Sequence, residues 1–225
     1  MALLVEPLMR TFLHTLKNAP ISRALLLASL ALLSACSEPQ EVALPPNSQV
    51  LALGDSLTAG YGVAAEEAWP TLLASKTGWT VINGGISGNT SSDALARLPS
   101  LMDEHHPTLV FITLGGNDML RHIPTQETIT NLEKMIALVR VHGAKPILLG
   151  IPEPSIAGAV FQNLSAAEFY RDVAKAQQVP LIEDAIADVL SDPQLKVDQL
   201  HPNAAGHQLL TEKILDELKK IGLAR

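Results

Sequence analysis

The stretch Leu51-Ala-Leu-Gly-Asp-Ser-Leu57 decides the fold of this chain of 225 residues. An apolar run over residues 50–53 ends at Gly54, and Ser56 follows two residues later. A short apolar run bounded by glycine is typical of a strand that is buried on both faces of a parallel sheet. Open α/β sheets bind their ligands just beyond the carboxyl ends of such strands. We therefore predict that Ser56 lies at a functional site.

Further strands and helices alternate along the chain. Apolar segments that are followed by glycine, or that are rich in β-branched residues, predict strands over 80–82, 109–114, 146–150 and 179–182. Periodic apolar positions and helix-end signals predict helices over 69–75, 93–101, 125–141, 165–177 and 203–221. Strands that alternate with helices in this way indicate a parallel sheet covered on both faces. The sequence thus predicts a single three-layer α/β domain.

Polar residues and glycines stand at the turns that follow these strands or precede the last helix. Gly88 lies in the turn after the second predicted strand, and Asn117 follows the third. Asp198 and His201 precede the last predicted helix. Because the carboxyl ends of parallel strands share one edge of a sheet, we expect Ser56, Gly88 and Asn117 to converge there.

These residue types fit the chemistry of a serine hydrolase. A serine hydroxyl is a weak nucleophile until a base accepts its proton. His201 is the predicted base, because Asp198, three residues earlier, can hold one ring nitrogen while the other faces Ser56. The negative charge that develops on a substrate carbonyl oxygen needs fixed donors. The backbone amides of Ser56 and Gly88 and the side-chain amide of Asn117 are the predicted donors.

Taken together, these segments resemble the four sequence blocks of the GDSL, or SGNH, hydrolase family. The blocks read Gly54-Asp-Ser-Leu57, Gly88, Gly116-Asn117-Asp118 and Asp198-x-x-His201. The similarity extends to residues 68–73, 86–90 and 95–99, which resemble the bacterial thioesterase, lysophospholipase and arylesterase branch. In all, the resemblance covers residues 49 to 221. A lone Gly-Asp-Ser is weak evidence, whereas four blocks in order at strand ends are specific.

The resemblance implies both a fold and an activity. The implied fold is a flavodoxin-like αβα sandwich with about five parallel strands, and the implied triad is Ser56, Asp198 and His201. The oxyanion donors would be Ser56, Gly88 and Asn117, with no metal and no cofactor. The implied substrates are small acyl esters or thioesters, such as aryl esters, acyl thioesters and lysophospholipids.

Other interpretations remain open at this point. A carbohydrate O-deacetylase shares the same blocks. A non-catalytic binding protein of the cell envelope on a disabled hydrolase scaffold would have lost at least one of Ser56, Asn117, Asp198 and His201. Nucleotide binding is disfavoured because neither a Walker ending nor a G-x-G-x-x-G fingerprint follows the first strand. The α/β-hydrolase fold is disfavoured because a G-x-S-x-G elbow does not occur.

The sequence also predicts roles for several residues near these motifs. Gly84-Gly85 predicts a looser second turn, and the bulky segment over 119–124 is expected to influence which acyl chains are accepted. Asp55 is expected to be structural, and Asp118 to bond its own loop as an Asx turn. His122 is expected beside the pocket. The remaining histidines are expected at the surface or in packing, namely His105, His106, His142 and His207.

The first 35 residues have the features of a secretory signal. Arg10, Lys17 and Arg23 precede an apolar run over 24–33, which is too short to span a membrane. The run ends in Leu33-Ser-Ala-Cys36, which resembles the bacterial lipoprotein processing box, and Met9 is an alternative start. We predict a lipoprotein-type signal over 1–35, a linker over 36–48 that begins at a lipidated Cys36, and a hydrolase domain over 49–225. Conventional cleavage or an uncleaved leader is the alternative.

Charge and cysteine content limit the partners. The chain has a formal net charge of −7, and removal of residues 1–35 takes away three basic residues and one acidic residue. Nucleic acid is an unsuitable partner for so acidic a domain. Cys36 is the only cysteine, so a disulfide within one chain is impossible. Because Ser37 follows Cys36, we expect a periplasmic domain with a lipid anchor in the outer membrane of a bacterial envelope.

Overall fold

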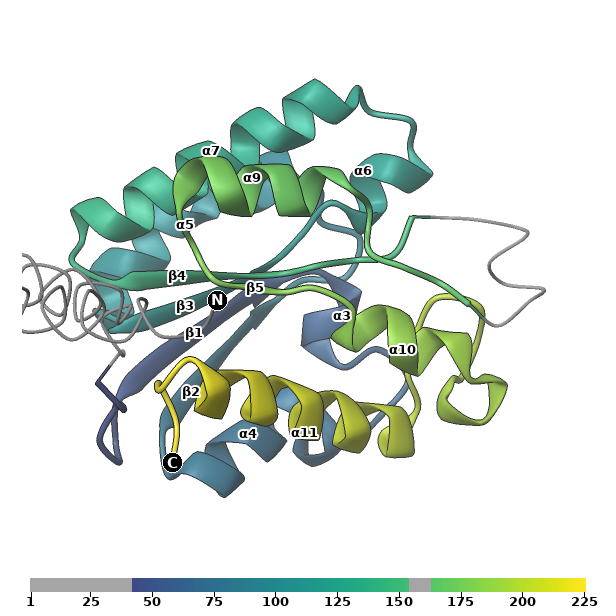
Figure 1. Cartoon of the computed structure of the whole chain (residues 1–225), viewed down its shortest axis with the longest axis horizontal. Coiled ribbons are helices and arrows are strands. Elements are labelled where there is room, and N and C mark those ends of the chain that lie inside the picture. The colour runs from purple at the N-terminus through teal and green to yellow at the C-terminus, as the bar shows by residue number, and fades with distance from the viewer. Residues whose placement is uncertain (1–41, 154–162) are drawn as a thin grey trace, which may run out of the picture. The chain divides into compact units, whose positions relative to one another are not determined.

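A five-stranded parallel sheet forms the centre of the domain (Figure 1). The structure, a computed structural model, describes residues 42–153 and 163–225. The strands are β1 (Gln49–Gly54), β2 (Thr80–Gly85), β3 (Leu109–Thr113), β4 (Lys145–Leu149) and β5 (Leu181–Ile182). Their spatial order, β2-β1-β3-β4-β5, is that of flavodoxin-like folds. The predicted fold class is confirmed.

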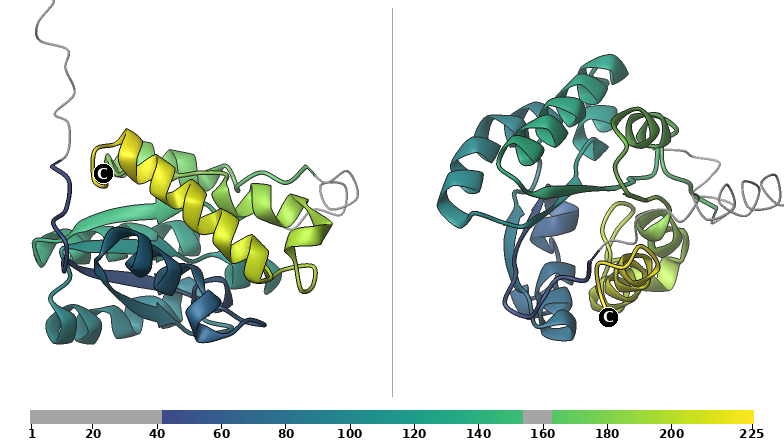
Figure 2. Two further views of the ribbon diagram at one scale, coloured as in Figure 1. Left: turned by 90° about the horizontal axis from the view of Figure 1, so that it is seen from below. Right: turned by 60° about the vertical axis from the view of Figure 1, so that its left-hand side comes forward.

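Helices cover both faces of the sheet, as Figures 1 and 2 show. On one face lie α5 (Ser91–His105), α6 (Gly116–Leu120), α7 (Thr125–Val141) and α9 (Phe169–Gln177). On the other lie α4 (Trp69–Thr77), α10 (Ala185–Ser191) and α11 (Ala204–Lys220). The shorter elements are α3 (Ser56–Ala59) and two 3₁₀ turns, Ala65–Glu67 and Pro193–Leu195.

The register of the sheet brings three strand ends level with one another. Gly54 at the end of β1 pairs with Gly85 of β2 on one side and with Thr113 of β3 on the other. Polar residues that follow these strands therefore meet at one edge, between β1 and β3, where the chain order reverses. In this topology that crevice is the usual ligand site.

Some element boundaries differ from those predicted. Helix α9 begins at Phe169, four residues later than predicted, because Ala166 forms a β-bridge with Pro152 and its amide donates to Asp184. Strand β5 is limited to two residues, since Pro180 has no amide hydrogen to donate to the sheet. Helix α5 begins two residues earlier than predicted because Thr90 and Asp93 form a capping box at its start, and it continues to His105, four residues past the predicted end.

Three of the sequence predictions concern residues at the start of the chain. The predicted signal over 1–35 and the predicted lipidation site Cys36 lie outside the described residues. Residues 42–48 of the predicted linker contact the domain, since the Leu44 amide donates to Leu223 O at 3.0 Å and the Asn47 amide to Gly78 O at 2.7 Å. Within residues 42–153 and 163–225, no helix combines the length and apolar character needed to cross a membrane.

His207 of α11 illustrates how the core affects the pH dependence of stability. The side chain is fully buried, and its Nδ1 accepts a hydrogen bond from the Trp69 amide at 3.4 Å. Burial lowers the pKa of His207 to about 4, which means that the folded protein holds this ring neutral. Its stabilising contribution is therefore complete above the unfolded pKa near 6.5 and is lost as the pH falls toward 4.

We expect the His207→Gln variant to lose this pH dependence. Relative to the variant, the wild-type free energy of unfolding should fall by about 3 kcal/mol between pH 7 and pH 4, because each pKa unit corresponds to about 1.4 kcal/mol. Urea unfolding of both proteins at several pH values between 4 and 7 measures this difference. Parallel stability curves would contradict a neutral, buried His207.

Candidate active site

Ser56 stands at the junction of β1 and α3. It is the first residue of the short helix α3, and Asp55 caps that helix by accepting a hydrogen bond from the Leu57 amide at 3.0 Å. The amides in the first turn of a helix have no partner within the helix. The Ser56 backbone amide is one of these, so it is available to a negatively charged oxygen. The sharp turn also directs the Ser56 hydroxyl outward beyond the strand end.

Asp198 and His201 lie in a tight turn before α11. The carboxylate of Asp198 accepts hydrogen bonds from the amides of Leu200 at 2.8 Å and His201 at 2.9 Å, which makes an Asx turn. A β-bridge between Lys196 and Pro202 closes the base of this turn. The three-residue spacing thus folds both side chains onto the same side of the turn, as predicted.

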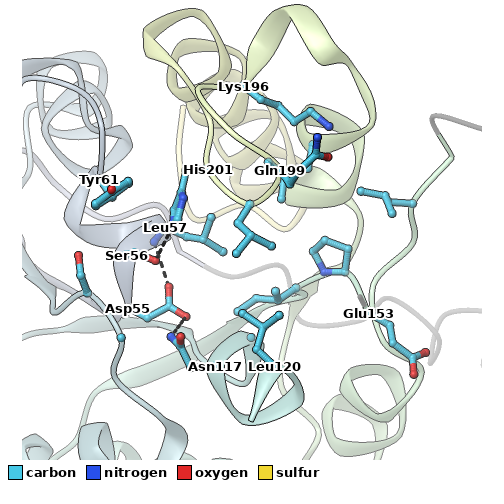
Figure 3. A pocket seen from close by; sticks show the side chains of 18 residues that line it. Asp55, Ser56, Leu57, Tyr61, Asn117, Leu120, Glu153, Lys196, Gln199 and His201 are labelled. Carbon is cyan, nitrogen blue, oxygen red and sulfur yellow. Dashed lines mark hydrogen bonds between the residues drawn. The ribbon is translucent and has the colours of Figure 1, made fainter. Parts of the chain in front are cut away.

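A continuous chain of hydrogen bonds links the side chains of Ser56, His201 and Asp198. Figure 3 shows the first two of these side chains in the pocket. The His201 Nε2 lies 2.9 Å from the Ser56 hydroxyl oxygen, and the His201 Nδ1 lies 2.8 Å from Asp198 Oδ2. Because an ionised carboxylate can only accept, Nδ1 carries the proton and Nε2 is left as the acceptor for the serine. The structure therefore brings together the three residues predicted to form the triad.

Two carboxyl groups near the serine have opposite pKa shifts. Partial burial favours the neutral form of Asp198, but hydrogen bonds from the His201 ring and from two backbone amides outweigh it and lower the pKa of this carboxyl. Burial raises the pKa of Asp55 to about 6, against the opposing effect of the Leu57 amide. Asp198 is therefore the anionic partner of His201, whereas Asp55 is a buried capping group.

The predicted oxyanion donors come from the turns after β1, β2 and β3. Gly88 has a φ of +81°, a left-handed conformation that favours glycine, and a Cβ at this position would lie 3.6 Å from the nearest atom, Arg121 Nη2. Glycine is thus required here for backbone conformation rather than for lack of space. Asn117 is the second residue of α6, directly beyond β3. Ser56, Gly88 and Asn117 all line one pocket.

Asn117 is held by two acceptors at its side-chain nitrogen. Its Nδ2 donates to Asn89 O at 3.0 Å and to Asp55 Oδ2 at 3.2 Å. Both bonds have ordinary N–H···O lengths, so together they fix the orientation of the side-chain amide. Because both amide hydrogens are used in these bonds, a substrate oxygen that accumulates negative charge would share one of them with its present acceptor.

The pocket around Ser56 has a volume of about 520 Å³ and a largely apolar lining (Figure 3). Its apolar wall combines Leu57 and Leu200, which lie within the motifs, Leu120 of the segment over 119–124, and four residues that the motifs do not include, namely Ile151, Pro152, Leu164 and Leu190. Charged and polar side chains also line it, including Glu153, Lys196 and Gln199. Tyr61 covers the His201 ring with a centroid distance of 4.5 Å. Ile151, Pro152, Leu164 and Leu190 are identified only by their position in space, since no spacing in the sequence marks them.

Three expectations about neighbouring residues were wrong. Asp118 is buried and accepts from the amide and hydroxyl of Ser91 and from the hydroxyl of Thr128, so it joins α6 to two other helices rather than bonding its own loop. His122 does not line the pocket. Gly84 and Gly85 belong to β2, and a Cβ at Gly85 would lie 2.2 Å from the Ala59 amide nitrogen, so close packing replaces the looser turn.

The segment over 119–124 contributes to the site in two ways. Leu120 lines the pocket, as Figure 3 shows, and Arg121 donates to Gly88 O at 2.8 Å.

Among the described residues, no group of three or more His, Cys, Asp or Glu side chains is arranged to hold a metal ion.

Comparisons with known proteins agree with this geometry. An arylesterase of Vibrio mimicus is 38% identical over 204 residues, which cover 88% of this chain and 98% of that protein. Thioesterase 1/protease 1/lysophospholipase L1 of Escherichia coli (strain K12) is 37% identical over 177 residues, 76% of this chain and 84% of that protein. A crystal structure of TesA is 33% identical with a TM-score of 0.70 and covers 77% of this chain and 99% of that one.

Residues 52–209 match the GDSL-like Lipase/Acylhydrolase family. The matched segment contains the serine, both further predicted oxyanion residues and the Asp198–His201 pair. The chain therefore belongs to the GDSL-like lipase/acylhydrolase family, and it is an ester-hydrolysing enzyme.

Proposed function

We propose that the chain hydrolyses aryl esters, acyl thioesters and lysophospholipids through an acyl-enzyme formed on Ser56. The observation that carries this proposal is the hydrogen-bond chain from Ser56 through His201 to Asp198, with Nε2 at 2.9 Å from the hydroxyl oxygen. A non-catalytic binding protein would have no reason to keep all three groups in this arrangement. The names of the relatives, an arylesterase and a thioesterase/lysophospholipase, support the choice of substrate class.

In the first half of the reaction, the Ser56 oxygen forms a bond to the carbonyl carbon of the ester while its proton passes to His201 Nε2. The carbonyl electrons move onto the carbonyl oxygen, and the resulting anion is bound by the Ser56 and Gly88 amides and by Asn117. When this intermediate collapses, the bond to the leaving oxygen or sulfur breaks, and His201 returns its proton to the leaving group. Asp198 stabilises the imidazolium that exists between these two transfers.

In the second half, water hydrolyses the acyl-enzyme. His201 accepts a proton from the water as its oxygen bonds to the acyl carbon, and the same three donors bind the second oxyanion. Collapse of that intermediate breaks the bond to the serine oxygen, to which His201 returns the proton. The products are a carboxylic acid and free enzyme.

The Asn117→Ala variant tests the role of the side-chain donor. We expect kcat to fall by about 10²- to 10³-fold with little change in KM, because the lost hydrogen bond strengthens only as the oxyanion forms. Steady-state kinetics with a short p-nitrophenyl ester measure both constants, and circular dichroism checks that the fold is kept. A variant with unchanged kcat would exclude Asn117 from the oxyanion site.

The shape and lining of the pocket support substrates with an apolar portion. A volume of about 520 Å³ lies within the range of sites for small molecules. Leucine, isoleucine and proline side chains provide apolar contact for an aryl group or acyl chain, while Lys196 and Glu153 provide charges for a polar leaving group. The apolar wall favours acyl esters over acetylated sugars, which would need more hydrogen-bonding groups.

A substrate panel with the purified protein tests this proposal. It should include p-nitrophenyl esters of increasing chain length, acyl-CoA thioesters, lysophospholipids and acetylated oligosaccharides, with the Ser56→Ala variant as the blank. The proposal predicts kcat/KM values for the first three classes that exceed those for acetylated sugars. A preference for acetylated sugars would instead establish a carbohydrate O-deacetylase.

We also propose that the domain is periplasmic and tethered to the outer membrane by a lipid on Cys36. The processing box Leu33-Ser-Ala-Cys36, the following Ser37 and the bacterial origin of the relatives support this location. In cell fractionation, the wild-type protein should be found with membranes and the Cys36→Ala variant in the soluble periplasmic fraction. A Cys36→Ala variant that stays entirely with the membranes would contradict the lipid tether.

A further inference from the structure

Arg97 connects two of the turns that surround Ser56, although it does not line the pocket. This residue lies on α5, and its side chain is partly buried behind the site. Its Nε donates to Asn89 Oδ1 at 2.9 Å, and its Nη2 donates to Gly54 O at 3.0 Å. Gly54 precedes Ser56 by two residues, and Asn89 directly follows Gly88. One guanidinium therefore holds the turn after β1 against the turn after β2.

The same contacts extend to the third turn. Asn89, whose side chain is held by Arg97, accepts a hydrogen bond from Asn117 Nδ2 at its own backbone oxygen, at 3.0 Å. The turn after β3 is thus attached to the turn after β2 at the residue that Arg97 fixes. All three predicted oxyanion donors lie within two residues of Arg97's partners or bond directly to one of them.

Arg97 has no evident role as an ordinary ion-pair partner. Among the described residues, no carboxylate forms a salt bridge with it. The nearest acid along the helix, Asp93, is engaged with Thr90 in the capping box. Burial lowers the pKa of Arg97, although Asp93 opposes the shift. Partial removal of the Arg97 cation from water costs free energy, and its two acceptors are both neutral. A need to hold the two turns in a fixed geometry explains why an arginine is kept at this position.

We propose that Arg97 is a positioning residue, which fixes the turns after β1, β2 and β3 so that the amides of Ser56 and Gly88 and the side chain of Asn117 point at one oxygen. This inference rests on the proposed function, since it takes the three donors from there. The rigid fork of a guanidinium suits two acceptors in different directions, whereas a lysine ammonium is a single point of charge. Arg97 acts on the transition state only through these donors.

The test uses the Arg97→Lys and Arg97→Met variants of the full domain. Arg140→Met is the matched control, because Arg140 also donates to two backbone oxygens, those of Gln177 and Gln178, at a turn remote from Ser56. The concentration of active sites in each preparation should be titrated with a fluorophosphonate, so that partial misfolding of a variant does not enter kcat. The readouts are kcat, KM and the inhibition constant of phenylboronic acid, whose tetrahedral serine adduct resembles the oxyanion intermediate.

We expect both Arg97 variants to lose about 10- to 10²-fold in kcat per titrated site, because small displacements of catalytic groups have effects of this size. The boronic acid should bind more weakly by a similar factor, while KM changes less than about threefold, a split typical of contacts made only in the transition state. Arg140→Met should retain wild-type values. Wild-type kcat per titrated site in both Arg97 variants would overturn the inference. So would a rise in KM that accounts for the whole fall in kcat/KM.

Failure of the inference about Arg97 can be distinguished from failure of the proposed function. If Ser56→Ala keeps its activity, the assignment of the nucleophile and its donors fails, whatever Arg97 does. If Ser56→Ala is inactive and the Arg97 variants are as active as wild type, the proposed function stands and only the role of Arg97 is wrong.

Discussion

The Ser56→Ala variant is expected to lose about 10⁴- to 10⁶-fold in kcat toward a short p-nitrophenyl ester. The alanine removes the only atom that could bond to the acyl carbon, and the hydrogen bond from Ser56 to His201 Nε2 at 2.9 Å is lost with it. The backbone amide of residue 56 remains, so binding and oxyanion contacts should sustain a residual rate above that of water. Initial rates with purified protein measure the loss.

Ser87→Ala is the matched control for this experiment. Ser87 lines the same pocket, but its hydroxyl has no hydrogen bond to His201 or Asp198 among the described residues. Its replacement should leave kcat within about threefold of the wild type, as for a residue without a role in the transition state. If Ser56→Ala retained substantial activity, the acyl-enzyme mechanism would be wrong.

The Asp198→Asn variant should lose about 10²- to 10⁴-fold in kcat. Asparagine can still accept the backbone hydrogen bonds of the turn, yet it is neutral and can present an N–H group to the imidazole. The His201 ring would then lose the carboxylate that lies 2.8 Å from its Nδ1, and the tautomer with Nε2 free to accept would no longer be favoured. Kinetics as a function of pH with the same ester measure this loss.

Asp192→Asn serves as the control for Asp198. Asp192 also caps a turn in this segment, through a hydrogen bond from the Gln194 amide at 2.8 Å, and it does not contact His201. This variant should keep wild-type kcat. Equal effects of the two substitutions would show that Asp198 acts on the stability of the turn and not on the imidazole.

Much of the fold could be predicted because its strands carry strong local signals. Strands β1, β3 and β4 are buried on both faces, and a continuous apolar run in the sequence indicates such burial. Helices α3, α6 and α10 were missed, since four to seven residues are too few for a periodic pattern. Two of these three begin beside the predicted functional residues, where a strand end turns sharply.

The predicted site residues could be read from the sequence because each follows a strand or precedes a helix at a marked turn. Ser56, Gly88, Asn117 and His201 line one pocket in the structure, and Asp198 bonds His201 from behind it. The apolar wall could not be predicted in this way. Ile151, Leu164 and Leu190 lie far apart along the chain and have the composition of ordinary core residues, so only the tertiary fold assigns them to the pocket.

The contacts of the residues that support the site could not be predicted from the sequence either. Asp118 was expected to bond its own loop, but it bonds Ser91, which is 27 residues away. Arg97 stood in a segment that resembles the family, and nothing in its spacing pointed to Gly54 or Asn89. Contacts of this kind depend on how α5 packs on the sheet.

Covalent labelling of the active enzyme with a fluorophosphonate, followed by peptide mass spectrometry, tests the central claim most directly. The account predicts one phosphonyl adduct per chain, located on Ser56, with loss of esterase activity in proportion to labelling. The Ser56→Ala variant should remain unlabelled, and Asp198→Asn should react more slowly than the wild type. An active enzyme that takes up no label, or that carries the adduct on a residue other than Ser56, would contradict it.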